Sequence, residues 1–163
     1  MKCSETRSVQ THIITFPYLN YHKTLFGGQL MAWLDETAGI SAMRLSREPI
    51  VTASVDHLDF LAPLKAGHSA CIEAFVSGTG KRSMEVFAKV IGEDLGTGER
   101  YLAGTSFMTF VVPKGNELPK IEPVTKEEQF ICSGYEGRKE NRQEKRSESL
   151  SLAAHVDLDM PWK

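Results

Sequence analysis

One stretch of the chain constrains its fold more than any other, and it runs from Asn20 to Arg44 (NYHKTLFGGQLMAWLDETAGISAMR). A polar loop leads through a pair of glycines into a segment that is apolar on nearly every side of a helix. Such a helix belongs inside a fold, with only a narrow edge in contact with water. A carboxylate on it must be hydrogen-bonded, ion-paired or functional. The acidic pair Asp35 and Glu36 is therefore the first candidate for chemistry in this sequence.

The spacing of apolar residues predicts the other elements. A first strand is predicted in residues 6–16 and the helix in residues 28–45. Strand-like segments follow at residues 50–61, 69–76, 83–91 and 100–112, most of them with period-two alternation. Glycine-bearing turns connect the last three segments, so they should pair antiparallel in one curved sheet that the helix covers on one face. This arrangement is an α+β hot-dog fold, an antiparallel sheet wrapped around one long buried helix.

The length of the chain favours a single folded domain. Its 163 residues can build one core but are too few for two comfortable domains. We assign the hot-dog domain to residues 1–125. Residues 126–163 are rich in charge and are predicted to form a C-terminal extension that is partly helical or disordered.

Composition argues against several classes of partner. A formal net charge of −2 gives no general attraction for nucleic acid or for an anionic membrane. Cys3, Cys71 and Cys132 are odd in number and lack metal-binding spacing, which predicts reduced thiols and no metal site. No apolar core of signal-peptide length opens the sequence, and no run of about eighteen apolar residues occurs. We therefore expect a cytoplasmic protein without nucleic-acid or membrane partners.

Three motifs carry a resemblance to a known family. They are the stretch quoted above, VTASVDHLDFLAPLKAG and GTGKRSMEVFAKV, and together they resemble the hot-dog acyl-CoA thioesterases, also called acyl-CoA hydrolases. The similarity is to single-domain bacterial members related to the animal cytosolic enzymes, and it covers roughly residues 5–147. The resemblance implies hydrolysis of acyl-CoA to a fatty acid and free CoA, without metal or cofactor. It also implies a catalytic aspartate at Asp35 and an active-site asparagine at Asn20.

Thioester hydrolysis gives these residues definite tasks. Asp35 can take a proton from the attacking water as general base, or attack the carbonyl itself as nucleophile, and the sequence leaves both open. The helix start at Gly27 and Gly28 offers free amides and a positive dipole end for the developing oxyanion. The Asn20 amide can orient the water or bind the thioester carbonyl. Gly27 and Gly28 are equally consistent with close packing of the helix start.

Helix geometry predicts that the site lies between two protomers. Asp35 follows Gly28 by seven residues, so the two are about 10 Å apart along one helix at 1.5 Å per residue. One carbonyl cannot easily touch both in the same chain. A two-fold homodimer would bring Asp35 of one chain beside Asn20 and the helix start of the other. The resemblance further implies a trimer of dimers, a hexamer.

The turn at Gly80, Lys81, Arg82 and Ser83 is the candidate for binding the CoA phosphates, because it supplies two cations and a hydroxyl on flexible backbone. In similar proteins this turn lies on the CoA path. Phe60 is a candidate for the border of the acyl channel.

Other polar residues are weaker candidates. Glu36 is expected to face solvent, and the loop residue His22 to be solvated. The alternation in residues 50–61 slips near His57, which predicts a β-bulge there.

Two other functions stay open from the sequence. The first is a non-catalytic acyl-CoA-binding or regulatory protein, which would tolerate the loss of Asp35. The second is a hydroxyacyl-thioester dehydratase on the same fold, although the pattern of loop histidine and helix glutamate that those enzymes share is absent here, because helix position 35 is Asp and loop position 20 is Asn. A purely structural assembly protein is less favoured still.

Overall fold

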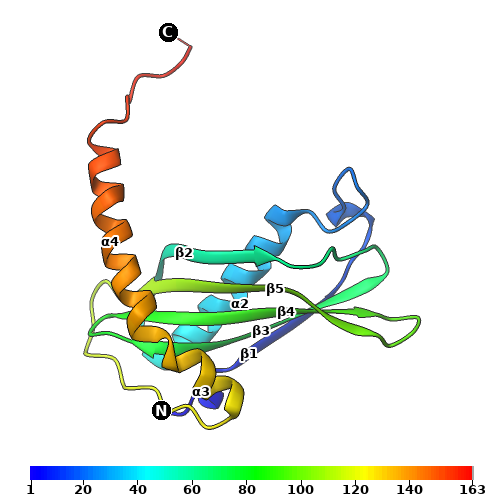
Figure 1. Cartoon of the computed structure of the whole chain (residues 1–163), viewed down its shortest axis with the longest axis horizontal. Coiled ribbons are helices and arrows are strands. Elements are labelled where there is room, and N and C mark those ends of the chain that lie inside the picture. The colour runs from blue at the N-terminus through cyan, green and yellow to red at the C-terminus, as the bar shows by residue number, and fades with distance from the viewer. Residues whose placement is uncertain (163) are drawn as a thin grey trace.

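The computed structural model describes residues 1–162 and contains one five-stranded antiparallel sheet wrapped around a long helix (Figure 1). The strand order is β1-β3-β4-β5-β2, so the last strand in the order pairs only with β5. The strands are β1 (Ser8–Ile13), β2 (Val51–Phe60), β3 (His68–Thr79), β4 (Ser83–Asp94) and β5 (Arg100–Val111). The predicted hot-dog fold is confirmed.

The central helix α2 (Gly27–Ser46) lies against one face of this sheet (Figure 1). Leu30, Leu34, Ala38 and Ala42 recur at i,i+4 steps, and all four are buried in the main core. The inward residues of β3, β4 and β5 complete that core through their period-two alternation. The helix ends where Arg47 adopts a left-handed conformation, with φ of 55°.

The first strand is shorter than predicted, because both of its expected ends form helical turns. Residues 3–6 form α1 (Cys3–Thr6), and residues 16–18 form the 3-10 turn η1 (Phe16–Tyr18). The Thr6 hydroxyl donates to the Cys3 carbonyl and accepts from the Val76 amide, which ends the turn against β3. These side-chain bonds compete with strand pairing, and alternation alone does not reveal them.

The opposite face of the sheet is covered by the C-terminal helices α3 (Lys126–Ser133) and α4 (Tyr135–Ala153) (Figure 1). A second, smaller apolar cluster lies beneath α1 and α3 and includes Phe75 and Phe87. Further along, α4 crosses the sheet and projects past the edge strand β2 (Figure 1). Its last two turns are exposed.

Candidate active site

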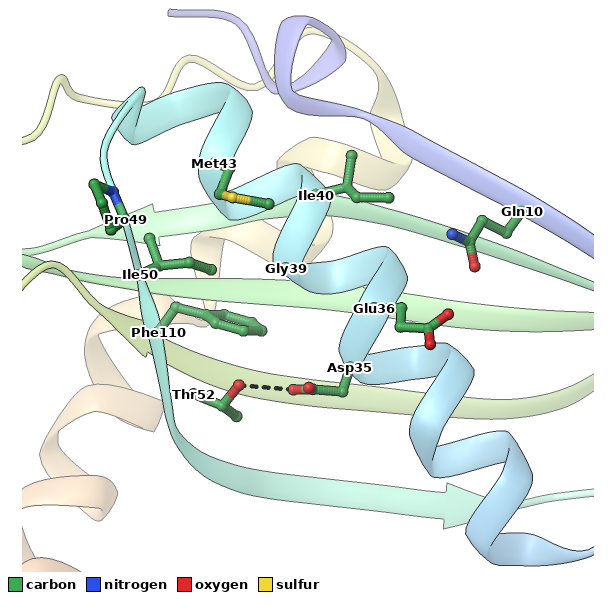
Figure 2. A pocket seen from close by; sticks show the side chains of 10 residues that line it. All are labelled: Gln10, Asp35, Glu36, Gly39, Ile40, Met43, Pro49, Ile50, Thr52 and Phe110. Atoms are coloured by element: carbon green, nitrogen blue, oxygen red, sulfur yellow. Dashed lines mark hydrogen bonds between the residues drawn. The ribbon is translucent and has the colours of Figure 1, made fainter.

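Asp35 lies at the mouth of a cleft between α2 and the start of β2 (Figure 2). The Thr52 hydroxyl donates a hydrogen bond of 2.8 Å to Asp35 Oδ1, and the Asp35 side chain remains partly exposed. The cleft has a volume of about 650 Å³. Beyond the carboxylate its lining is mostly apolar and comes from Gly39, Ile40, Met43, Ile50 and Phe110. The partly buried carboxylate therefore meets a space that suits an apolar chain.

Thr52 is a site residue that the sequence did not single out. No recognisable motif links Thr52 to Asp35 in the sequence. Only the crossing of β2 over α2 brings the two side chains together. The irregular path of β2 was predicted, however. The pairing of β2 with β5 shifts register between Thr52 and Ser54, and again between Val55 and His57, which confirms the bulge expected near His57.

Asn20 lies in a different cleft of the same chain. Its side-chain oxygen accepts from the amides of His22 (2.9 Å) and Thr24 (3.1 Å), and its amide nitrogen donates to the Thr24 hydroxyl (3.0 Å). This second cleft also contains Gly27 and Phe60, and it has no lining residue in common with the Asp35 cleft. Within one chain, the fold thus brings Asn20, Gly27 and Phe60 together and leaves Asp35 apart from them.

The helix start presents free amides beside Phe60. The first helical bonds of α2 run from the amides of Gln29 and Leu30 to the Phe26 carbonyl, and no side chain caps the helix within residues 1–162. A Cβ on Gly27 would lie 3.5 Å from the Phe60 ring, while one on Gly28 would lie 2.5 Å from the Phe26 ring. A Cβ on Gly28 would therefore require the exposed Phe26 ring to move, whereas Gly27 lines the second cleft.

The turn at residues 80–83, which joins β3 to β4, lies at the same end of the sheet as the Asp35 cleft. The strand register shows this, since Val111 pairs with both Ser83 and Val51. Lys81 and Arg82 are exposed, and Arg82 donates a 3.1 Å hydrogen bond to the Pro113 carbonyl. A Cβ on Gly80 would lie 2.9 Å from the Ser83 hydroxyl, so the Ser83 side chain would have to rotate away to admit one.

The remaining sequence candidates do not contact the Asp35–Thr52 pair. Glu36 is exposed at the rim of the Asp35 cleft, and His22 is exposed in the loop. His57 Nε2 lies 2.7 Å from Asp59 Oδ2 on the exposed edge strand. Among residues 1–162, no three His, Cys, Asp or Glu side chains gather in a way that would hold a metal ion.

Comparison with known proteins places the chain in a family. A model of the thioesterase superfamily matches residues 22–99. The uncharacterized acyl-CoA thioester hydrolase YkhA of Bacillus subtilis is 44% identical, over 98% of this chain and 95% of the relative. The chain belongs to the acyl-CoA thioester hydrolases of the thioesterase superfamily. The family named from the three motifs is thereby confirmed.

Two solved structures of this hydrolase family extend the comparison. An acyl-CoA hydrolase from Staphylococcus aureus, solved with butyryl-CoA, CoA and CoA disulfide, is 33% identical with a TM-score of 0.90, over 95% of this chain and 97% of that one. Alanine variants of the same protein have been solved with an aspartate, a threonine or an asparagine replaced. A hexameric acyl-CoA thioesterase is 37% identical with a TM-score of 0.86, over 90% of this chain and 96% of that one.

No helix in the described part of this hydrolase is both long enough and apolar enough to cross a membrane.

Proposed function

We propose that this protein hydrolyses acyl-CoA to a carboxylic acid and free CoA, with Asp35 as the catalytic carboxylate. The observation that carries the proposal is the Asp35–Thr52 pair at the mouth of an apolar cleft, in a chain of the acyl-CoA thioester hydrolase family. A thioester carbonyl placed at this mouth has a carboxylate beside it, and its acyl chain enters the apolar part of the cleft.

The hydrogen bond from Thr52 favours the general-base role. It engages Asp35 Oδ1 and so fixes the plane of the carboxylate, which leaves Oδ2 to receive a proton from water. That water attacks the thioester carbonyl, and the C–S bond then breaks to release CoA as its thiol. Direct attack by Oδ2, with an anhydride intermediate, is the alternative route.

The second half of the site is proposed to come from a partner chain. Strand β2 is a sheet edge, and Val51 and Val55 on it are about half exposed. If two such edges pair antiparallel about a two-fold axis, the Thr52 end of one β2 meets the Phe60 end of the other. That pairing joins the Asp35 cleft of one chain to the Asn20 cleft of its partner. The Gly27 amide then becomes the oxyanion donor, with Gly28 a secondary candidate.

Residue spacing in the Staphylococcus aureus hydrolase supports the same set. The asparagine replaced there precedes the replaced aspartate by 15 residues, and the replaced threonine follows that aspartate by 17. Asn20, Asp35 and Thr52 have these same types and separations. We also propose a trimer of dimers, which the hexameric relative supports.

CoA is proposed to bind along the turn that joins β3 to β4. Lys81 and Arg82 would meet the phosphates, with the Gly80 backbone and the Ser83 hydroxyl beside them. The resting protein needs no cofactor in this scheme, since CoA is part of substrate and product. We place the activity in the cytoplasm and in lipid metabolism.

The test follows free CoA with a thiol reagent, using short, medium and long acyl-CoAs. Asp35→Asn should lower kcat by about 100-fold or more while CoA still binds, because the base is lost and the side-chain volume is kept. Glu99→Gln makes the same chemical change at an exposed position in the β4–β5 hairpin and should leave kcat unchanged. CoA binding without turnover in the parent protein would favour the non-catalytic binding protein, and full activity of Asp35→Asn would remove Asp35 from the mechanism.

A further inference from the structure

Two thiols from opposite ends of the chain meet on the outer face of the sheet. Cys3 in α1 and Cys132 in α3 are 129 residues apart, and their sulfur atoms are 3.7 Å apart. Cys3 is 0% exposed, whereas Cys132 is partly exposed. Both belong to the small apolar cluster around Phe75 and Phe87, so their contact is largely shielded from water. The proposed hydrolysis uses neither thiol, because the Asp35 cleft lies on the other face of the sheet.

The backbone is fixed on the Cys3 side of this contact. The Cys3 amide donates a 3.1 Å hydrogen bond to the Glu122 carbonyl, next to a bridge between Lys2 and Glu122. On the far side of Cys3, the Thr6 hydroxyl ties α1 to Val76 of β3. The thiol of Cys3 is therefore held in place by its neighbours and does not depend on a loose N-terminus.

The Cys132 side is fixed by a buried carboxylate. Glu128 is 0% exposed and accepts hydrogen bonds from the amides of Val124 and Thr125, at 2.8 and 2.9 Å. It also pairs with Arg7 at 2.8 Å, which joins α3 directly to the segment after α1. Since both helices are anchored to each other and to β3, the two sulfur atoms form a built contact between distant parts of the sequence.

The contact makes the two thiols unequal. The hydrogen bond between them lowers the pKa of Cys132 and raises the pKa of Cys3, and the nearby Arg138 guanidinium lowers the pKa of Cys132 further. Burial and the Glu128 and Glu85 carboxylates act in the opposite direction on Cys132 and offset part of this lowering. Burial and Glu128 both add to the raised pKa of Cys3. Cys132, which is also the more accessible, is thus the thiol that reacts first with a molecule from solution.

We propose that Cys3 and Cys132 are a dithiol site that reacts with a low-molecular-weight disulfide and closes an intramolecular disulfide bond. The Cys132 thiolate attacks one sulfur of the small disulfide, whose S–S bond breaks and releases one small thiol. Cys3 then loses its proton and attacks the Cys132 sulfur, which forms the protein disulfide and releases the second small thiol. Two protein thiols are oxidised, and one disulfide is reduced to two thiols.

The bond would tie the N-terminal segment to α3 without touching the cleft. It closes a loop of more than one hundred residues, so it strongly limits the unfolded chain and should raise thermal stability. Hydrolysis of acyl-CoA should persist, because neither α2 nor β2 contributes a residue to the dithiol site. The thiols are reduced in the resting protein, and the site would respond when small disulfides accumulate.

The experiment uses the full chain in a Cys71→Ser background, so that only the two thiols of interest remain. The folded protein is incubated with glutathione disulfide, unfolded, labelled with a maleimide and weighed by mass spectrometry. We expect no maleimide label, a mass lower by two hydrogens, and one linked peptide pair that contains Cys3 and Cys132. Dithiothreitol should restore both labels. The thermal midpoint of the oxidised form should rise by roughly 5–15 °C.

Two single variants test the order of attack. In the same background, Cys3→Ser should accumulate a mixed disulfide on Cys132, whereas Cys132→Ser should accumulate almost none, because Cys3 is buried. Circular dichroism of each reduced variant checks that it is folded, and CoA release checks that turnover is kept. Retention of both maleimide labels after exposure to glutathione disulfide would overturn the proposal, and so would a disulfide between two chains.

Discussion

At the scale of single residues, the Asp35–Thr52 contact is the feature on which the proposed chemistry depends. Thr52 contributes one hydroxyl donor to a carboxylate that is otherwise free to rotate at the edge of an open cleft. In the proposed mechanism Thr52 positions Asp35 and does not need to touch substrate. A threonine on an exposed edge strand can lose this hydroxyl at little cost to the fold, so its contribution to catalysis can be measured by itself.

Thr52→Val removes the donor and keeps the shape of the side chain. We expect kcat for acyl-CoA hydrolysis to fall about 10–100-fold with KM nearly unchanged, because the orientation of the base is lost while binding surfaces remain. Thr52→Ser should restore most of the rate, since it returns the hydroxyl. If the serine variant were as slow as the valine variant, the methyl group and its packing would be the important part of Thr52.

At the scale of elements, α4 is held to the sheet by a buried ionic cluster. The Glu85 side chain on β4 is 0% exposed and accepts hydrogen bonds from Arg138 Nε (3.0 Å), Arg138 Nη2 (2.9 Å) and Ser77 Oγ (2.7 Å). Arg142 also contacts it. The Arg138 guanidinium lies 4.1 Å from the centroid of the Phe107 ring. Ionic and cation–π contacts therefore contribute to docking the helix on the sheet.

Glu85→Gln should lower the free energy of unfolding by about 2–4 kcal/mol, because two guanidinium groups lose a buried carboxylate that they cannot replace with water. Denaturant unfolding followed by circular dichroism measures this change. Glu136→Gln removes the charge of an exposed pair with Lys139 on the same helix, and it should cost at most a few tenths of a kcal/mol. Equal effects of the two substitutions would show that the cluster does not dock α4.

The same elements mark the limit of prediction from sequence. The central helix and the meander of strands were predicted because their periodicities are local, and each stretch reports its own burial. Arg138 and Arg142 were indistinguishable from a solvated charge run, since their partner Glu85 is 53 and 57 residues away. Thr52 went unnoticed for a similar reason, because β2 reaches Asp35 only after the sheet has closed around α2.

At the scale of the whole molecule, one chain holds two incomplete halves of the proposed site. Asp35 and Thr52 line one cleft, and Asn20 and Gly27 line another that shares no residue with it. Asp35 follows Gly27 by eight residues on one rigid helix, a rise of about 12 Å, so no adjustment of side chains alone joins the two halves. Association of two chains at the exposed β2 edge is the arrangement that we propose to join them.

Mixing two inactive chains tests this arrangement. Asp35→Ala and Asn20→Ala should each be inactive as pure proteins, since each removes one half of every composite site. In oligomers that contain both variants, purified through two different tags, a site is intact when a chain with Asp35 faces a partner with Asn20. A dimer purified through both tags has one intact site of its two, whereas a hexamer with random pairing has about a quarter of its sites intact, so CoA release should return to about half of the parent rate for dimers and about a quarter for hexamers. A mixture of Asp35→Ala with Asp35→Asn is the matched control and should stay inactive, because every cleft in it lacks the carboxylate. If the first mixture also stays inactive while its chains demonstrably associate, Asn20 and Asp35 do not complete each other across the interface, and the site belongs to a single chain.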